Sequence, residues 1–183
     1  MKKLGVKSVV ATAIEAALVF VLLRFVAIPT PFPDTTLSIY AAVVAFFSVM
    51  FGPIVGFLGG FLGNLIVDLT AGWGVWWTWV IVTGVYGLFV GLGCRKIELD
   101  QGVFGKKELV RFCVVSVISA LVCWGFLAPV GDILVYQEPA NLVFIQGLFV
   151  GLSAIISTVI VGSILCKAYA ASKAKKGSLS KED

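Results

Sequence analysis

The sequence predicts an all-α integral membrane protein with six transmembrane helices and both termini in the cytoplasm. Hydrophobic residues make up 60% of the 183 residues and charged residues only 13%, more apolar surface than a soluble globule of this length could bury. Every lysine and arginine except Arg24 lies in one of three clusters, at the N-terminus, within residues 95–111, or from Lys167 onward. Basic segments next to spanning helices stay in the cytoplasm, so these clusters predict the topology.

The first predicted span covers residues 6–28, which are apolar apart from Glu15 and Arg24 and lack the cleavage site of a signal peptide. The next apolar stretch, residues 37–69, is too long for one ordinary span and too short for two, since a span needs about 20 residues. Gly52-Pro53 divides it. Two cytoplasmic basic clusters require an even number of crossings between them, so we predict two helices, 37–51 and 53–69, rather than one kinked helix.

The remaining predicted spans cover residues 76–94, 108–128 and 141–170. Together the six spans form a single membrane domain over residues 1–170, and residues 171–183 form a basic, polar cytoplasmic tail. The predicted external loops, 29–36, 70–75 and 129–140, contain acidic residues and no lysine or arginine. Their charge agrees with the cytoplasmic placement of the basic clusters.

The residues that most membrane enzymes need are missing. The chain has no histidine, which is the commonest metal ligand and general base, and its four cysteines are scattered without a C-x-x-C spacing. No phosphate-binding loop with the required glycine spacing is present. We therefore expect no metal, no cofactor and no enzymatic activity, and any ATP-driven work would need a partner protein.

Several polar residues interrupt the predicted spans. Glu15 should face protein, because an ionised carboxylate in lipid costs several kcal/mol; it is either a neutral group hydrogen-bonded to a neighbouring helix or a group with a coupling role. Arg24 and Asp68 lie near the external ends of their helices, where they could form an ion pair or simply reach the interface. Asn64 shares a helix face with Asp68. A third alternative is therefore that these polar residues form the wall of a cavity open to the outside.

Small and aromatic residues mark two further surfaces. Ala13 and Ala17 form a small-xxx-small face on the first helix, roughly opposite Glu15, which is suited to close approach of a partner helix. A tryptophan cluster precedes and opens the fourth span, and it is either an interfacial belt or part of a ligand site. The second reading is favoured by the mixture of rings and hydroxyls on one helix face, namely Trp76, Trp79, Thr83 and Tyr86.

These features together match a family. With the Ala13/Ala17 face, a proline-rich first loop and the run Phe51-Gly52-Pro53-Ile54-Val55-Gly56, the chain resembles the substrate-binding S components of energy-coupling factor (ECF) transporters, group II, over nearly its whole length. The runs Lys7-Ser8-Val9-Val10-Ala11 and Trp76-Trp77-Thr78-Trp79 are similar to a subfamily that includes a cobalamin-specific S component.

The resemblance implies a multi-pass protein of the bacterial cytoplasmic membrane that captures a vitamin outside the cell. It would deliver the vitamin by toppling in the membrane while docked, through Ala13 and Ala17, on a transmembrane coupling protein with two ABC ATPase subunits. Cobalamin is the favoured substrate, with riboflavin or a thiamine precursor as alternatives. By position, the resemblance nominates as substrate-binding residues Phe32, Asp34, Trp73, Trp76, Trp79, Thr83, Tyr86, Tyr136 and Asn141.

The sequence also allows two rival functions. A small intramembrane enzyme could use Glu15 and Asp68, but their predicted depths in the membrane differ too much for a paired-carboxylate site. A scaffold or channel subunit would have the same hydropathy, and it would differ from an S component in binding no small molecule on its own.

Overall fold

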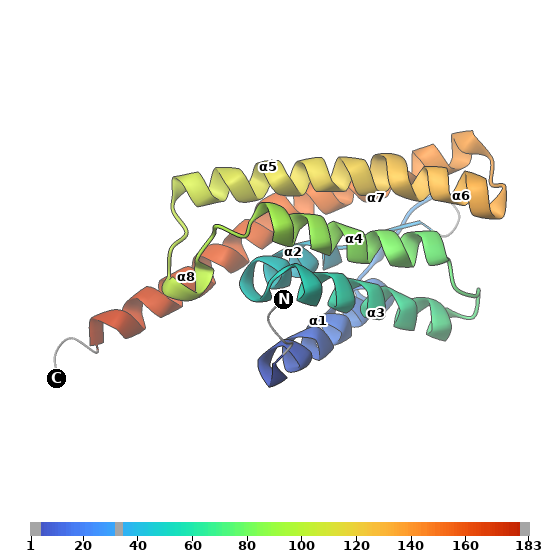
Figure 1. The fold of residues 1–183 in the computed structure, drawn as a ribbon. Coiled ribbons are helices and arrows are strands. Elements are labelled where there is room, and N and C mark those ends of the chain that lie inside the picture. The colour runs from blue at the N-terminus through green and yellow to red at the C-terminus, as the bar shows by residue number, and fades with distance from the viewer. Residues whose placement is uncertain (1–4, 32–34, 180–183) are drawn as a thin grey trace.

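The computed structural model describes residues 5–31 and 35–179, with side chains described up to Lys173. The described chain is a bundle of six helical rods with one short strand pair (Figure 1). The first four rods are α1 (Val6–Phe25), α2 (Tyr40–Phe51), α3 (Pro53–Ala71) and α4 (Trp77–Gly93). The fifth rod joins α5 (Lys106–Val122), a π-helical turn (Cys123–Leu127) and α6 (Ala128–Tyr136), and the sixth joins α7 (Ala140–Ser157), a second π-helical turn (Thr158–Gly162) and α8 (Ser163–Leu179).

The break at Gly52 is a hairpin turn, as predicted. Gly52 has a φ of 99°, which glycine adopts readily because it lacks a Cβ, and Pro53 then begins α3. Gly59 of α3 packs against Glu15 of α1, and Gly63 packs against Val19. These contacts advance in the same direction along both helices, so α3 runs parallel to α1, and α2, which precedes α3 in the chain, runs in the opposite direction and packs against both.

Glycines also set the distance between α3 and α4. A Cβ added at Gly60 would lie 3.0 Å from the carbonyl oxygen of Thr83, and one added at Gly84 would lie 2.9 Å from the carbonyl oxygen of Phe57. Both helices thus expose backbone to each other, as small residues allow in membrane helix pairs. Gly60 and Gly84 therefore serve close helix packing in this pair.

The fifth rod is longer than predicted. The sequence predicted a helix ending near residue 128 and a loop over residues 129–140, and a proline inside a helix is unfavourable because it lacks a backbone N–H. Helix continues instead through Pro129 to Tyr136. The π-helical turn immediately before Pro129 widens the coil and changes its hydrogen-bond register, which accommodates the proline.

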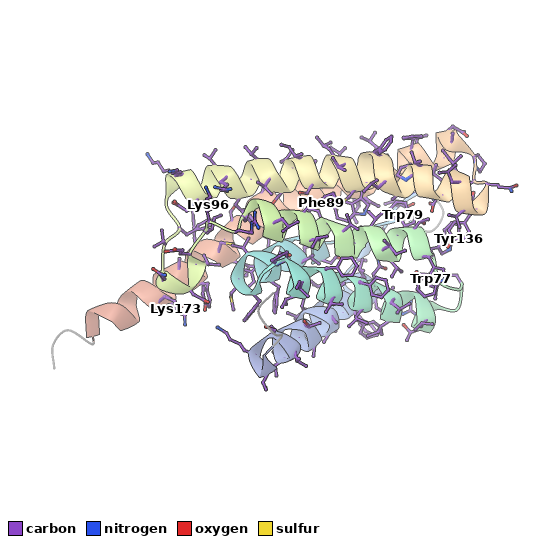
Figure 2. All side chains as sticks on the ribbon, in the orientation of Figure 1. Trp77, Trp79, Phe89, Lys96, Tyr136 and Lys173 are labelled. Carbon is purple, nitrogen blue, oxygen red and sulfur yellow. The ribbon has the colours of Figure 1, made fainter. Side chains whose placement is uncertain are left out.

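The two ends of the bundle differ in chemistry. At one end Asp100 lies 3.8 Å from the Lys7 ammonium and accepts a hydrogen bond of 2.9 Å from the Tyr169 hydroxyl, so three distant segments meet there. Figure 2 shows Lys96 and Lys173 toward this basic end, and Trp77, Trp79 and Tyr136 at the opposite, aromatic end. The segregation follows the charge clusters from which the topology was predicted.

Four rods are long and apolar enough to cross a membrane: Val6–Phe25, Pro53–Ala71, Lys106–Tyr136 and Ala140–Lys173. The other two helices are apolar but shorter. The 12 residues of α2 cover about 18 Å at about 1.5 Å per residue, less than a hydrocarbon core of about 30 Å. Six spans with cytoplasmic termini therefore stay a prediction, while the all-helical architecture is observed.

Glu15 faces protein, as the cost of a carboxylate in lipid led us to expect. Its side chain is 0% exposed, and neither carboxyl oxygen has a hydrogen-bond partner among the described residues. The hydrogen bond to a neighbouring helix that one alternative required is therefore not formed within the described chain. The side chain occupies the space left by the missing Cβ of Gly59.

This contact yields a testable prediction. Gly59→Ala should destabilise the protein by about 1–3 kcal/mol, because the new Cβ would lie 2.6 Å from Cγ of Glu15 and would force this fully buried side chain to shift. Combining it with Glu15→Ala should restore much of the loss. Thermal unfolding in detergent measures both, with Gly125→Ala as the control, since a Cβ there meets nothing within 4 Å. Equal melting temperatures for Gly59→Ala and Gly125→Ala would contradict the packing described.

Candidate functional site

A cavity of about 390 Å³ lies at the aromatic end of the bundle, where the strand pair and all six rods converge. The strands β1 (Ile28–Pro29) and β2 (Thr36–Leu37) are antiparallel, with Ile28 opposite Leu37, and they close the first loop beside it. The lining residues are Leu23, Pro29, Thr30, Thr35, Thr36, Tyr40, Asn64, Val67, Asp68, Trp73, Trp76, Trp79, Asp132, Glu138, Leu142, Gln146 and Val150.

Asp68, near the end of α3, shapes the turn into α4. Its carboxylate accepts a hydrogen bond of 3.0 Å from the backbone N–H of Trp76 and one of 3.3 Å from the indole N–H of Trp73. Gly72 and Gly74 both have a φ of 89°, which allows the chain to turn tightly on either side of Trp73. The two indoles are thereby anchored at the cavity wall.

Arg24 is not the partner of Asp68. Its side chain is exposed, and the described residues contain no ion pair between the two. Asp68 is 7% exposed and is hydrogen-bonded to the turn instead. Of the alternatives that the sequence left open, the polar cavity wall is the one observed, because Asp68 and Asn64 both line the cavity.

Asp132 connects α6 to α4. Its carboxylate accepts hydrogen bonds from the hydroxyl of Thr78 and, at 2.6 Å, from the indole N–H of Trp79. These contacts hold the Trp79 ring in one orientation at the cavity wall. The sequence placed Asp132 in a loop. In the structure the fifth rod extends through Asp132 and packs its side chain, which is 1% exposed, against α4.

Tyr136 lies behind the tryptophan wall. Its hydroxyl accepts a hydrogen bond of 2.9 Å from the backbone N–H of Trp77. Its ring centroid is 4.7 Å from that of Trp76, tilted by 54°. Tyr136 is therefore a positioning residue for Trp76 and does not line the cavity.

Thr83 and Tyr86 lie deeper and are fully buried. Asn64 donates a hydrogen bond of 2.8 Å to the Thr83 hydroxyl, which in turn donates one of 2.9 Å to the carbonyl of Trp79. The Tyr86 hydroxyl shares a hydrogen bond of 2.9 Å with Thr158 of the sixth rod. Neither residue lines the cavity; Thr83 supports its floor and Tyr86 belongs to the core.

Of the nominated substrate-binding residues that the structure describes, only Trp73, Trp76 and Trp79 line the cavity. Asn141 is exposed near the start of α7 and is not part of the lining. Phe32 and Asp34 lie outside the described residues. Sequence reasoning missed several lining residues. Among them are Tyr40, Gln146 and Glu138.

Those omissions have different causes. Glu138 lies in the predicted external loop 129–140, and no sequence pattern places it beside the other lining residues. Tyr40 and Gln146 lie in apolar helices where no local pattern singles them out. Among the described residues no group of three His, Cys, Asp or Glu side chains could hold a metal ion. The arrangement is suited to stacking and hydrogen-bonding an organic molecule.

The chain is similar to known proteins over nearly its whole length. Residues 3–171 match the family model described as "ECF-type riboflavin transporter, S component". A UPF0397 protein of Lactococcus lactis subsp. cremoris (strain NZ9000) is 47% identical over 182 residues, covering 100% of both chains. A UPF0397 protein of Lactobacillus acidophilus is 44% identical over 180 residues, covering 98% of this chain and 97% of the relative.

A solved structure has the same fold at low sequence identity. It is described as "Structure and mechanism of the S component of a bacterial ECF transporter", and it superposes with a TM-score of 0.54 and 17% identity. The match covers 96% of this chain and 98% of that one.

Proposed function

Because the chain belongs to the family of ECF-type riboflavin transporter S components, we propose that it captures a vitamin-sized organic molecule outside the cell, in the cavity at its aromatic end. ECF S components are multi-pass membrane proteins and not themselves enzymes; they work with a module of one transmembrane coupling protein and ATPases. The observation that supports the proposed site is the 390 Å³ cavity, walled by three indoles and closed by the strand pair.

The cavity volume favours a small substrate. Pockets for drug-sized ligands span about 300–1,000 Å³, so about 390 Å³ suits a molecule of two or three rings. Cobalamin, the substrate favoured by the sequence resemblance, is a corrin with an attached nucleotide and would require the first loop and the aromatic wall to move apart. A flat vitamin of the size of riboflavin or a thiamine precursor would require less movement, and the substrate is left to the binding test below.

Delivery requires a surface for the coupling protein. Ala13 and Ala17 are exposed on α1, on the side of the helix away from buried Glu15 and Val19. Their neighbours Ile14 and Leu18 are exposed too. We propose this face as the docking surface, on which α1 meets a helix of the coupling protein and the S component topples to release its substrate inside.

The test of the proposed function is calorimetric titration of the detergent-purified protein with riboflavin, thiamine, a thiamine precursor and cobalamin. Saturable one-to-one binding of one of them is expected and would identify the cargo. Binding of cobalamin alone would show that the cavity opens much further than its present volume. Absence of binding across the panel by a folded sample would favour a scaffold function and contradict the proposal.

A further inference from the structure

We propose that the cavity selects a positively charged, flat heteroaromatic molecule and rejects anions. This inference rests on the proposed function, since it concerns the ligand of the same cavity. It is carried by three observations: two buried carboxylates in the cavity wall, no basic side chain beside them, and an aromatic lining that includes three indoles.

The carboxylates of Asp68 and Asp132 are 7% and 1% exposed, and both residues line the cavity. Each accepts two hydrogen bonds, but the donors are neutral: a backbone N–H, a hydroxyl and two indoles. An ionised carboxylate has about four acceptor positions, so each group retains capacity for a ligand. These hydrogen bonds hold the carboxyl groups in place, and their neutral donors supply no counter-charge.

The described part of the cavity lining carries no positive charge. No lysine or arginine is among its described lining residues, and the ion pair found in the described chain, between Lys7 and Asp100, lies at the opposite end of the bundle. Arg24, the one basic residue outside the three clusters, is exposed and does not line the cavity. Glu138 adds a third carboxylate to the wall.

Buried charge without a counter-ion is unfavourable at membrane depth, and a cationic ligand would supply the missing charge. The aromatic lining strengthens the same preference, because the faces of indole and phenol rings attract cations. Trp73, Trp76, Trp79 and Tyr40 provide such rings, and their flat surfaces also favour a planar ligand. An anion, such as a phosphorylated or carboxylated form of the ligand, would be repelled by three carboxylates.

The test uses three probes that share one bicyclic ring system: N-methylquinolinium, which is cationic, quinoline, which is neutral in mildly alkaline buffer, and quinoline-2-carboxylate, which is anionic. Affinities for the detergent-purified protein are measured by calorimetry. N-methylquinolinium is expected to bind at least tenfold more tightly than quinoline, and quinoline-2-carboxylate is expected not to bind. Asp68→Asn, Asp132→Asn and Glu138→Gln should each reduce the preference for the cation.

Glu98→Gln is the matched control, because Glu98 is exposed and lies outside the cavity. It should leave the preference unchanged. Glu138→Gln keeps the test valid if the aspartate variants misfold, since within residues 5–31 and 35–173 no hydrogen bond from the cavity wall goes to the Glu138 side chain. Thermal unfolding of each variant shows that it is folded.

The outcomes distinguish failure of the charge preference from failure of the proposed function. Equal affinity for quinoline and N-methylquinolinium would overturn the charge preference and leave capture of a flat molecule standing. A cation preference that survives all three cavity substitutions would also overturn it, because the carboxylates would not be its source. Failure of every probe and every vitamin to bind would contradict both the inference and the proposed function.

Discussion

Replacing Ala13 and Ala17 together by tryptophan is expected to abolish uptake and leave ligand binding unchanged. Both alanines are exposed on α1, and the buried side of the helix at this level carries Glu15, Ala16 and Val19. The new indoles would therefore project away from the protein's own core. They would keep a partner helix from approaching the backbone of α1, which close helix packing in membranes requires.

Uptake of labelled ligand is measured in proteoliposomes that contain the S component, its coupling protein and ATPases, and binding is measured by calorimetry on the isolated S component. The matched control is Val114→Trp with Ile118→Trp on α5, a pair that is also exposed and four residues apart. The control should retain uptake. If the Ala13/Ala17 variant retained it as well, α1 would not be the docking surface.

The second large effect concerns the cavity wall. Trp76→Ala and Trp79→Ala are each expected to weaken ligand binding by roughly 30-fold, the equivalent of about 2 kcal/mol for loss of a buried aromatic anchor. Trp76 is held by Tyr136 and by its backbone contact with Asp68, and Trp79 by Asp132. Because these rings are already oriented before ligand arrives, little conformational entropy is lost on binding.

Trp77→Ala is the matched control. Trp77 belongs to the same cluster, but its side chain is 49% exposed and does not line the cavity. Its hydrogen bond to Tyr136 is made by the backbone N–H and survives the substitution. Calorimetric affinities of the three variants decide the matter. Unchanged affinity in Trp76→Ala and Trp79→Ala would return the cluster to the role of an interfacial aromatic belt.

Much of the fold could be predicted because its signals are local. Hydropathy and the basic clusters indicated helical rods, and Gly52-Pro53 indicated the turn between α2 and α3, which the contacts of Gly59 and Gly63 confirm. The prediction that a loop begins at Pro129 was wrong, because a π-helical turn just before this residue accommodates the proline within the helix. Such a turn has no recognised sequence pattern.

The candidate site could be predicted only in part. The tryptophan cluster was visible as a run of rings at a span entrance, and three of its members line the cavity. Thr83 and Tyr86 share their helix face, but that face turns from the cavity into the core as the helix descends. Helical periodicity predicts which residues share one face of a helix. It does not predict which other elements pack against that face at each position along the helix.

The sequence by itself determined that this chain is a helical membrane protein with a basic and an aromatic end and with small residues exposed together on its first helix. These properties depend on the solvent preference of each side chain and on spacing within one helix. Only the tertiary structure decided that Asp68 and Asp132 flank one cavity, because α3 and α6 are brought together by the packing of the whole bundle. Contacts between residues far apart in the sequence, such as Trp79 and Asp132, 53 positions apart, decide which aromatic rings face that cavity. Such contacts also decide that its carboxyl groups have no basic partner among the described residues.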